Sequence, residues 1–136
     1  MRAVKGMSAG KLIRSALIND SYTYSYVGNK VWPLVANDGT TFPFIVYNRT
    51  NLSSPYNSKD GWIGDNVSFS VNVASDDYDE SCIVADYARN ALENNILSNS
   101  YLVLDSIRLI SASESFVEDT FIQTMNFDAQ AYNPDA

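Results

Sequence analysis

The clearest pattern in the sequence is a strict alternation of apolar and polar residues over residues 67–74. The apolar set is Val67, Phe69, Val71 and Val73, and the polar set is Ser68, Ser70 and Asn72. Alternation with a period of two places successive side chains on opposite sides of a strand. We therefore expect a strand with one buried face and one polar face.

Two earlier segments also have the composition of strands. Residues 41–50 are rich in aromatic and β-branched side chains, with Pro43 near the start, where a missing N–H does least damage. Residues 30–34 form a brief extended piece, in which Pro33 favours a position at the edge of a sheet.

Two longer strands are expected near the C-terminus, at 101–112 and 116–131. The second alternates in part, with Phe121, Gln123, Met125 and Phe127 on one side. A turn at 113–115 would join the two strands as an antiparallel hairpin, and a break in the first is expected near Asp105 and Ser106.

Apolar residues at three- and four-residue spacing predict two helices. The first covers residues 8–19, with Ser8 as its N-cap and an apolar stripe of Leu12, Ile13, Ala16 and Leu17. The second runs from about 75 to 94, with acidic residues in its first turn, where the helix dipole favours them. Its expected buried face comprises Ile83, Val84, Tyr87, Ala88, Ala91 and Leu92. Residues 20–29, between the first helix and the first strand, are expected to be a loop.

The resulting order, α-β-β-β-α-β-β, predicts the α+β class. We expect one domain over residues 1–136, in which a mostly antiparallel sheet of about five strands carries two helices on one face. Residues 1–7 and 133–136 are expected to be flexible ends. The polar segment 51–66 is predicted to be either a long loop or a β-hairpin arm.

The residue inventory excludes several kinds of chemistry. The sequence has no histidine, which removes Ser/His and Cys/His catalytic pairs and His-ligated metal sites. Its one cysteine, Cys82, can form neither an internal disulfide nor a cysteine zinc site. We therefore predict a protein that is not an enzyme and that has no cofactor and no bound metal. No apolar stretch approaches the roughly 20 residues needed to cross a bilayer, so no membrane association is expected.

The net charge of −7 hides an asymmetry along the chain. Residues 1–75 carry seven Lys/Arg against four Asp/Glu, which is +3, and residues 76–136 carry two against twelve, which is −10. An isoelectric point of about 4.3 argues against nucleic-acid binding as the main activity, because phosphate contacts need a basic surface. The charge either serves solubility alone or belongs to a polar molecule whose two faces meet different partners.

Acidic residues cluster at the start of the second helix, at Asp76, Asp77, Asp79 and Glu80. They could bind a divalent cation, but they lack the spacing and central glycine of an EF-hand loop, and helix capping explains them without a ligand. The carboxylates of Glu114, Glu118 and Asp119 could be proposed for acid–base catalysis. Nothing around them predicts the burial that would raise a pKa, so we favour solvated carboxylates.

Aromatic residues provide the candidate contacts with other proteins. The run Tyr22, Tyr24 and Tyr26 could stack on nucleic acid, but it has few basic neighbours, so we favour an interface or a packing face. Trp62 and Ile63 lie in the polar segment 51–66, where they either anchor a partner or fold back over the core.

Several short motifs, in this order, resemble the tail-completion, or tail-terminator, proteins of tailed bacteriophages. The resemblance rests on the helix with Lys11-Leu12-Ile13 and Ala16-Leu17, on Val27-Gly28-Asn29-Lys30-Val31-Trp32-Pro33, on Phe42-Pro43-Phe44-Ile45-Val46-Tyr47, and on a strand leading into a helix with Ala88-Arg89-Asn90-Ala91-Leu92. A closing β-hairpin completes the match, which extends from Lys11 to about Tyr132. The long segment 51–66 departs from the family pattern.

The resemblance implies a structural protein of the virion tail or neck, assembled in the host cytoplasm. Such proteins form rings, commonly hexameric, at the head-proximal end of the tail, where they end the tail tube and join it to the head connector, and DNA passes through without specific binding. Candidate interface residues are Trp62, Ile63, Tyr56 and Tyr24. The acidic cluster Asp76, Asp77, Asp79 and Glu80 is a candidate lumen or partner face. Two alternatives stay open: a head-completion or adaptor ring protein of the same neck, and a small α+β binding module without a viral role.

Overall fold

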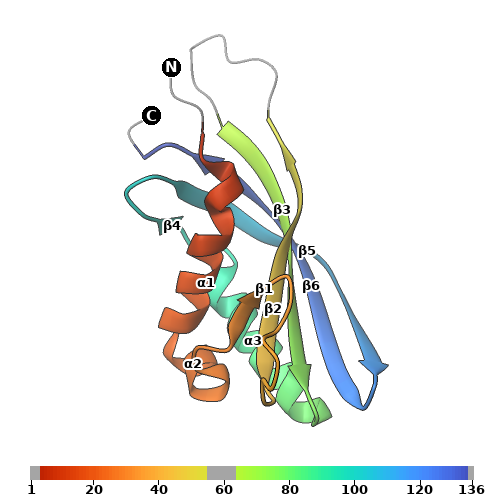
Figure 1. The fold of residues 1–136 in the computed structure, drawn as a ribbon. Coiled ribbons are helices and arrows are strands. Elements are labelled where there is room, and N and C mark those ends of the chain that lie inside the picture. Colours follow the sequence, from red (N-terminus) through yellow and green to blue (C-terminus); the bar gives the residue numbers. More distant parts are fainter. Residues whose placement is uncertain (1–3, 55–63, 135–136) are drawn as a thin grey trace.

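The computed structural model describes residues 4–54 and 64–134. Its helices are η1 (Gly6–Ser8, a 3-10 turn), α1 (Ala9–Asn19), α2 (Ser21–Val27) and α3 (Tyr78–Leu92). Its strands are β1 (Val31–Pro33), β2 (Phe44–Ser53), β3 (Gly64–Ser75), β4 (Leu97–Ser98), β5 (Val103–Val117) and β6 (Thr120–Tyr132). Figure 1 shows a long, twisted sheet with the helices lying along one side.

The described strands form one six-stranded sheet in the order β1-β2-β3-β6-β5-β4. All neighbouring pairs are antiparallel except β1 and β2, which are parallel and pair Val31 with Ile45. The α+β class is therefore confirmed, with six strands instead of about five. The additional strand, β4, has two residues, which is too short to produce a periodic pattern. As expected from Pro33, β1 lies at an edge of the sheet.

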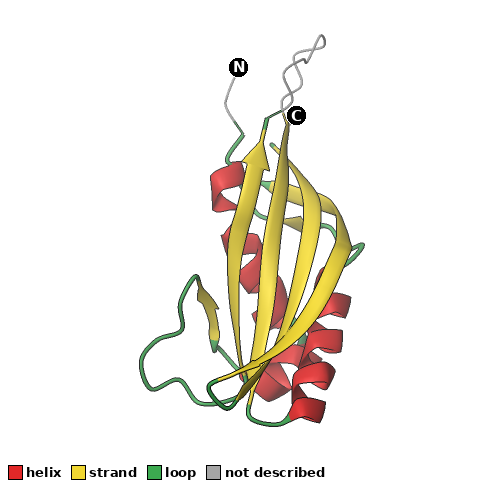
Figure 2. Cartoon of the chain, turned by 90° about the vertical axis from the view of Figure 1, so that its right-hand side faces the viewer, coloured by secondary structure: helices red, strands yellow, loops and turns green. Residues whose placement is uncertain are grey.

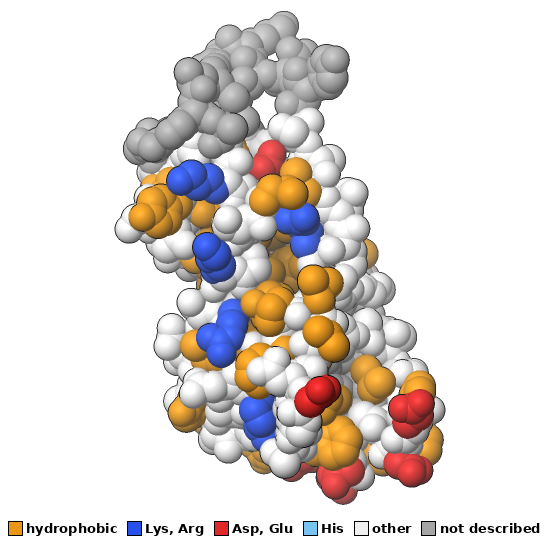
Figure 3. Space-filling model, in the orientation of Figure 1, with side chains coloured by type: hydrophobic (Ala, Val, Ile, Leu, Met, Phe, Trp, Pro, Cys, Tyr) orange, Lys and Arg blue, Asp and Glu red, His pale blue; other side chains and the backbone are white. Residues whose placement is uncertain are grey.

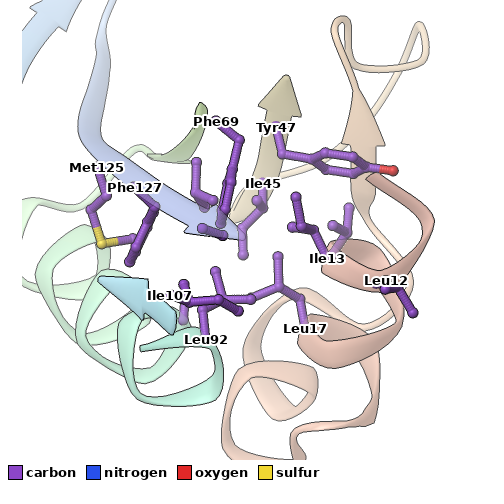
Figure 4. Close-up of a cluster of buried hydrophobic side chains, with 14 of the residues drawn as sticks. Leu12, Ile13, Leu17, Ile45, Tyr47, Phe69, Leu92, Ile107, Met125 and Phe127 are labelled. Atoms are coloured by element: carbon purple, nitrogen blue, oxygen red, sulfur yellow. The ribbon is translucent and has the colours of Figure 1, made fainter. Parts of the chain in front are cut away.

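The helices cover one face of the sheet and enclose the core with it (Figure 2). The odd-numbered side chains of β3 point into this core, and Phe69 stacks on Phe127 of β6 with ring centroids 5.2 Å apart. Ile13 and Leu17 of α1 reach the same cluster, as Figure 4 shows. The period-two pattern thus correctly predicted which face of β3 is buried.

The opposite face of the sheet carries a ladder of polar side chains. Ser68 Oγ donates to Asp128 Oδ1 at 2.7 Å, and Ser70 Oγ donates to Asn126 Oδ1 at 2.6 Å. One step further, Thr124 Oγ1 donates to Asn72 Oδ1 at 2.8 Å. Hydrogen bonds between neighbouring strands therefore satisfy polar groups on the face that the helices leave uncovered.

The predicted loop at 20–29 is wrong, because most of it is the helix α2. The carboxylate of Asp20 caps this helix, accepting from the backbone N–H of Thr23 at 3.0 Å and from its hydroxyl at 2.7 Å. Tyr22 and Tyr26, four residues apart and hence on one side of a helix, pack against Tyr87 of α3 at 5.2 and 6.0 Å. The polar composition of this segment favoured a loop, but capping and aromatic packing produce a helix.

The predicted turn at 113–115 is also wrong. Strand β5 continues to Val117, and the turn consists of Glu118 and Asp119, with φ of 51° and 59°. An aromatic pair across the two strands supports the extension, since the rings of Phe116 and Phe121 lie 4.7 Å apart. The expected break near residues 105–106 is confirmed by a register shift after Asp105.

Helix α3 begins at Tyr78 and carries its buried residues on a narrower face than expected. These residues are Ser81, Val84, Ala85, Ala88 and Leu92. Ile83 was predicted to be buried, but it is 40% exposed because it lies outside this stripe.

The ends of the segment 51–66 belong to strands. Asn51 pairs with Ser68 and Ser53 with Asn66, so β2 and β3 form an antiparallel pair that continues into the segment. Residues 55–63 lie outside the described part of the chain. Within the described part, no helix is long and apolar enough to cross a membrane.

Candidate functional site

The acidic cluster at 76–80 caps helix α3. Asp77 is the N-cap, and its carboxylate accepts from the backbone N–H of Glu80 at 2.9 Å. The carboxylate of Glu80 accepts in turn from Ser75 Oγ at 2.8 Å. Asp76 and Asp79 are exposed and add negative charge at the same helix end. Among the residues that the structure describes, no group of three or more His, Cys, Asp or Glu side chains could hold a metal ion.

The fold brings a second acidic segment to this end of the molecule. Ser75, just before the cluster, pairs with Phe121, just after the β5–β6 turn that holds Glu118 and Asp119. We call this region the acidic end and define it by Asp76, Asp77, Asp79, Glu80, Glu114, Glu118 and Asp119. No Lys or Arg occurs at 60–88 or 109–136, so these two segments supply no positive charge of their own. Most of the acidic side chains visible in Figure 3 lie at this lower end.

A hydrogen-bonded group joins the two segments of the acidic end. The hydroxyl of Tyr78 donates to Glu114 Oε2 at 2.9 Å, and Gln123 Nε2 donates to the same oxygen at 3.0 Å. The bonds from Gln123 and from Tyr78 lower the pKa of Glu114, and the bond to Glu114 raises the pKa of Tyr78 to about 12. Glu114 therefore stays ionised at neutral pH, which is the opposite of what a general acid needs.

A shallow hollow of about 260 Å³ lies beside this group. It is lined by Tyr78, Glu114, Ser115, Phe116, Phe121 and Gln123. Phe116 is 57% exposed at its rim, and Tyr78 meets Phe121 edge to face at 5.6 Å. The hollow thus combines an aromatic floor with an ionised carboxylate, as protein contact surfaces commonly do.

Cys82 lies beside this group and takes part in its hydrogen bonding. Gln123 Nε2 approaches its sulfur at 3.7 Å, and the side chain is half-buried between α3 and β6. The sequence has no histidine that could act as a base for the thiol.

The opposite side of the subunit is basic. We define the basic side as Lys11, Arg14, Lys30 and Arg49. Lys5 does not belong to it, because its ammonium lies 4.6 Å from the ring centroid of Tyr101, between β4 and β5. Figure 3 shows Lys and Arg side chains along α1 and its neighbours, and the lowest of them lies near acidic side chains at the lower end. Three of them bind backbone carbonyls: Arg14 that of Val31, Lys30 that of Thr41 and Arg49 that of Met7.

Beside these basic residues, the loop 34–43 leaves β1 and carries two exposed apolar side chains. Leu34 is 77% exposed and Val35 is 73% exposed. Leu34 also has a φ of 67°, a conformation that a leucine rarely adopts. Figure 2 shows β1 and this loop standing out at the side of the sheet.

Of the predicted interface residues, the structure places only Tyr24. It lies on α2 and is 47% exposed. Tyr22 and Tyr26 of the same run contact Tyr87, although Tyr22 is itself 64% exposed. Trp62, Ile63 and Tyr56 lie outside the described residues, so their predicted role as contacts stays a prediction.

Two surfaces were missed from the sequence: the Leu34–Val35 loop and the outer edge of β5. The first spans the end of the extended piece predicted at 30–34 and the unassigned stretch after it, and nothing in the sequence indicates that Leu34 and Val35 are exposed. The second was hidden because the turn was predicted at 113–115. This placed residues 114–117 in the turn and at the start of the next strand.

The comparisons with known proteins agree with this fold. A family model described as tail completion protein gp17 matches residues 11–132. A comparison with curated protein sequences gives no match. Among solved structures, a chain from the "Virion of native gene transfer agent (GTA) particle" is similar with a TM-score of 0.72 and 18% identity, over 89% of this chain and 92% of that chain. A second solved chain has a TM-score of 0.57 and 12% identity, over 88% of this chain and 94% of that chain.

At these identities the solved structures support the fold alone. The family match is broader evidence, because it runs from α1 to the end of β6 and so includes every helix and strand that builds the sheet and its cover. The chain belongs to the tail completion protein gp17 family.

Proposed function

We propose that this tail completion protein is one subunit of a ring at the head-proximal end of the tail. The ring, a hexamer by the resemblance described above, ends the growing tail tube and joins it to the head connector. Each subunit then binds its two neighbours, the tube and the connector, and none of these contacts requires chemistry.

The observation that supports the ring is the separation of charge across one sheet. The acidic end lies on the β5 side, and basic residues lie beside β1, at the other end of the strand order. A ring built by head-to-tail contacts needs two different, complementary surfaces on every subunit. Opposite charges on the two sides supply that complementarity and also disfavour a contact of one side with itself.

The acidic cluster has two possible places in such a ring. Facing the lumen, Asp76, Asp77, Asp79 and Glu80 would repel DNA phosphates and let DNA pass without binding. Facing a neighbouring subunit, they would attract its basic side. Neutralising all four side chains tests both places, because unchanged DNA passage together with unchanged assembly would contradict both.

The ring is tested by measuring the mass of the purified chain with size-exclusion chromatography and light scattering, followed by mixing with tail-tube protein. We expect a closed oligomer that binds tube ends and stops tube growth. A chain that stays monomeric at high concentration and assembles with neither tube nor connector proteins would contradict the proposal. Binding to the connector without binding to tube ends would assign the chain to a head-completion ring instead.

We also propose that Trp62, Ile63 and Tyr56 contact a neighbouring subunit or partner. The substitution Trp62→Ala should then impair assembly and leave the monomer folded, as measured by light scattering and circular dichroism. If the monomer unfolds instead, Trp62 belongs to the core.

A further inference from the structure

We infer that the outer edge of β5, residues 110–117, binds the Leu34–Val35 loop and the basic side of the next copy of this chain. This contact rests on the proposed ring and identifies the two surfaces that would build it. The open edge is defined here as residues 110–117.

The open edge is long and exposed for a natural sheet. Strand β4 pairs with β5 only at Val103 and Leu104, and the carboxylate of Glu93 accepts the backbone N–H of Leu109 at 2.8 Å. From Ile110 to Val117, no other strand of the described chain lies on the outer side of β5. Such an edge offers unpaired N–H and C=O groups for the addition of another chain.

The open edge has only part of the protection that edge strands usually carry, namely the charge of Glu114 and a register irregularity between Leu109 and Ser111. Its sequence, Ile-Ser-Ala-Ser-Glu-Ser-Phe-Val, has no proline and no lysine. Three of its apolar side chains are at least half exposed, namely Ile110 (50%), Phe116 (57%) and Val117 (53%). An edge of this kind would invite uncontrolled pairing unless a specific partner covers it.

Charge indicates that the partner is another copy of this chain. The edge joins the acidic end, which holds seven carboxylates and no Lys or Arg from its own two segments. The basic side supplies the complementary charge, and in one subunit it lies beside β1, at the far edge of the sheet from β5. A subunit therefore carries both halves of the contact but cannot bring them together within itself.

Charge also sets the geometry of the contact. Pairing two open edges symmetrically would bring two acidic ends together, and like charges at close range are unfavourable. A head-to-tail contact places an acidic end against a basic side at every boundary. The exposed Leu34 and Val35 of one copy then cover the apolar residues of the open edge, including Phe116 beside the aromatic hollow, in the next.

The register indicates which backbone groups are available at the open edge. Val117 and Thr120 flank a two-residue turn and so form the hydrogen-bonded pair that closes the hairpin. Because bonded and non-bonded pairs alternate in an antiparallel ladder, Phe116, Glu114 and Ala112 direct their N–H and C=O groups away from β6.

One substitution can be designed to disrupt the open edge and another to disrupt the Leu34–Val35 loop. Ala112→Pro removes an outward N–H and keeps the ladder to β6, since proline is tolerated where the N–H of an edge strand faces solvent. Ala112→Thr is its matched control, because threonine keeps the N–H and suits a strand. Leu34→Asn removes the exposed apolar side chain from the loop. Asparagine tolerates the positive φ at this position, so the fold should not suffer.

The decisive experiment mixes the two variants and measures mass by sedimentation velocity. We expect Ala112→Pro and Leu34→Asn each to weaken self-association at least tenfold and to remain monomeric, while Ala112→Thr forms the wild-type oligomer. An equimolar mixture of the two defective variants should form a one-to-one dimer and no ring. The intact loop of Ala112→Pro can bind the intact open edge of Leu34→Asn, but the other two surfaces of this dimer are both defective. Circular dichroism of each variant establishes that the monomers are folded.

Three results would overturn the inference. They are normal rings from Ala112→Pro, normal rings from Leu34→Asn, and a mixture of the two that stays monomeric. Each would leave the proposed function intact as long as the wild-type chain forms rings. A wild-type chain that stays monomeric, alone and with tail-tube protein, would contradict the proposed function itself.

Discussion

At the scale of single residues, the core depends on a few large side chains that reach it from the sheet. Phe69 of β3 has no exposed surface and stacks on Phe127, so no surrounding side chain can fill its place without moving. Phe116 is the same residue type on the same sheet, but it is 57% exposed. The two residues therefore have the same side chain and differ only in how deeply it is buried.

We predict that Phe69→Ala lowers the free energy of unfolding by about 3–5 kcal/mol, because it removes buried apolar surface and leaves a cavity. Phe116→Ala is the matched control and should change this free energy far less. Urea denaturation followed by circular dichroism measures both. Equal effects of the two substitutions would contradict the assignment of Phe69 to the core and Phe116 to the surface.

The contribution of Tyr78 and Glu114 to stability depends on pH, under both acidic and alkaline conditions. Because the pKa of Glu114 is lowered by folding, its contribution to stability is present above the unfolded pKa and is lost as pH falls through the folded pKa. The pKa of Tyr78 is raised from 10 to about 12, so its contribution is present below pH 10 and is lost as pH rises toward 12.

We predict that the difference in phenolate absorbance between the wild type and Tyr78→Phe titrates near pH 12. Glu114→Gln should move this titration down toward the ordinary tyrosine value, because the negative charge that holds the proton is lost. A Tyr78 titration near pH 10 in the wild-type chain would mean that the hydrogen bond between the two side chains is absent.

At the scale of secondary-structure elements, the two acidic segments have different local roles. Asp77 and Glu80 form hydrogen bonds at the start of α3, whereas Asp76 precedes the helix and is exposed. Glu118 and Asp119 form the β5–β6 turn, where both have a positive φ. Helix capping therefore explains Asp77 and Glu80 but not Glu118 and Asp119.

We predict that Asp77→Ala lowers the free energy of unfolding by about 1 kcal/mol, because the N–H of Glu80 loses its acceptor. Asp76→Ala removes the same charge without removing a cap bond and serves as the control. Thermal denaturation of the two variants at one salt concentration tests the difference. A loss in Asp76→Ala as large as that in Asp77→Ala would attribute the effect to charge alone.

At the scale of the whole molecule, the uneven distribution of charge along the sequence becomes an uneven distribution of charge over the surface. The −10 half of the sequence supplies the acidic end through α3 and the β5–β6 hairpin, and the +3 half supplies the basic side through α1, β1 and β2. The chain belongs to a family of structural proteins of the virion tail, and under the proposed function its charged sides would bind neighbouring subunits.

We predict that salt weakens self-association, because raising the ionic strength from about 0.1 M to about 1 M shortens the screening length from about 10 Å to about 3 Å. The double variant Glu118→Asn/Asp119→Gly should associate more weakly and depend less on salt, since it removes two charges. Asn-Gly also favours the two-residue turn, so the hairpin should not be weakened. Association that is unaffected by salt in both proteins would contradict an electrostatic contact.

Local patterns in the sequence were sufficient for the fold class and for most elements. The alternation of Val67, Phe69, Val71 and Val73 predicted a strand with one buried face, because side-chain direction in a strand follows directly from residue parity. The acidic start of α3, the edge position of Pro33 and the break near residue 105 were predicted for equally local reasons. The absence of histidine and the single cysteine are properties of the sequence itself.

Tertiary structure alone decided which distant segments meet. The pairing of Ser75 with Phe121 joins two acidic segments into one end, and the pairing of Phe116 with Phe121 moves the turn beyond residue 115. No periodic pattern encodes these contacts, because they depend on the register between strands, which the alternation within one strand does not fix. The sequence thus determined the elements and the charge that each carries, and the packing of the sheet decided that opposite charges lie at opposite edges.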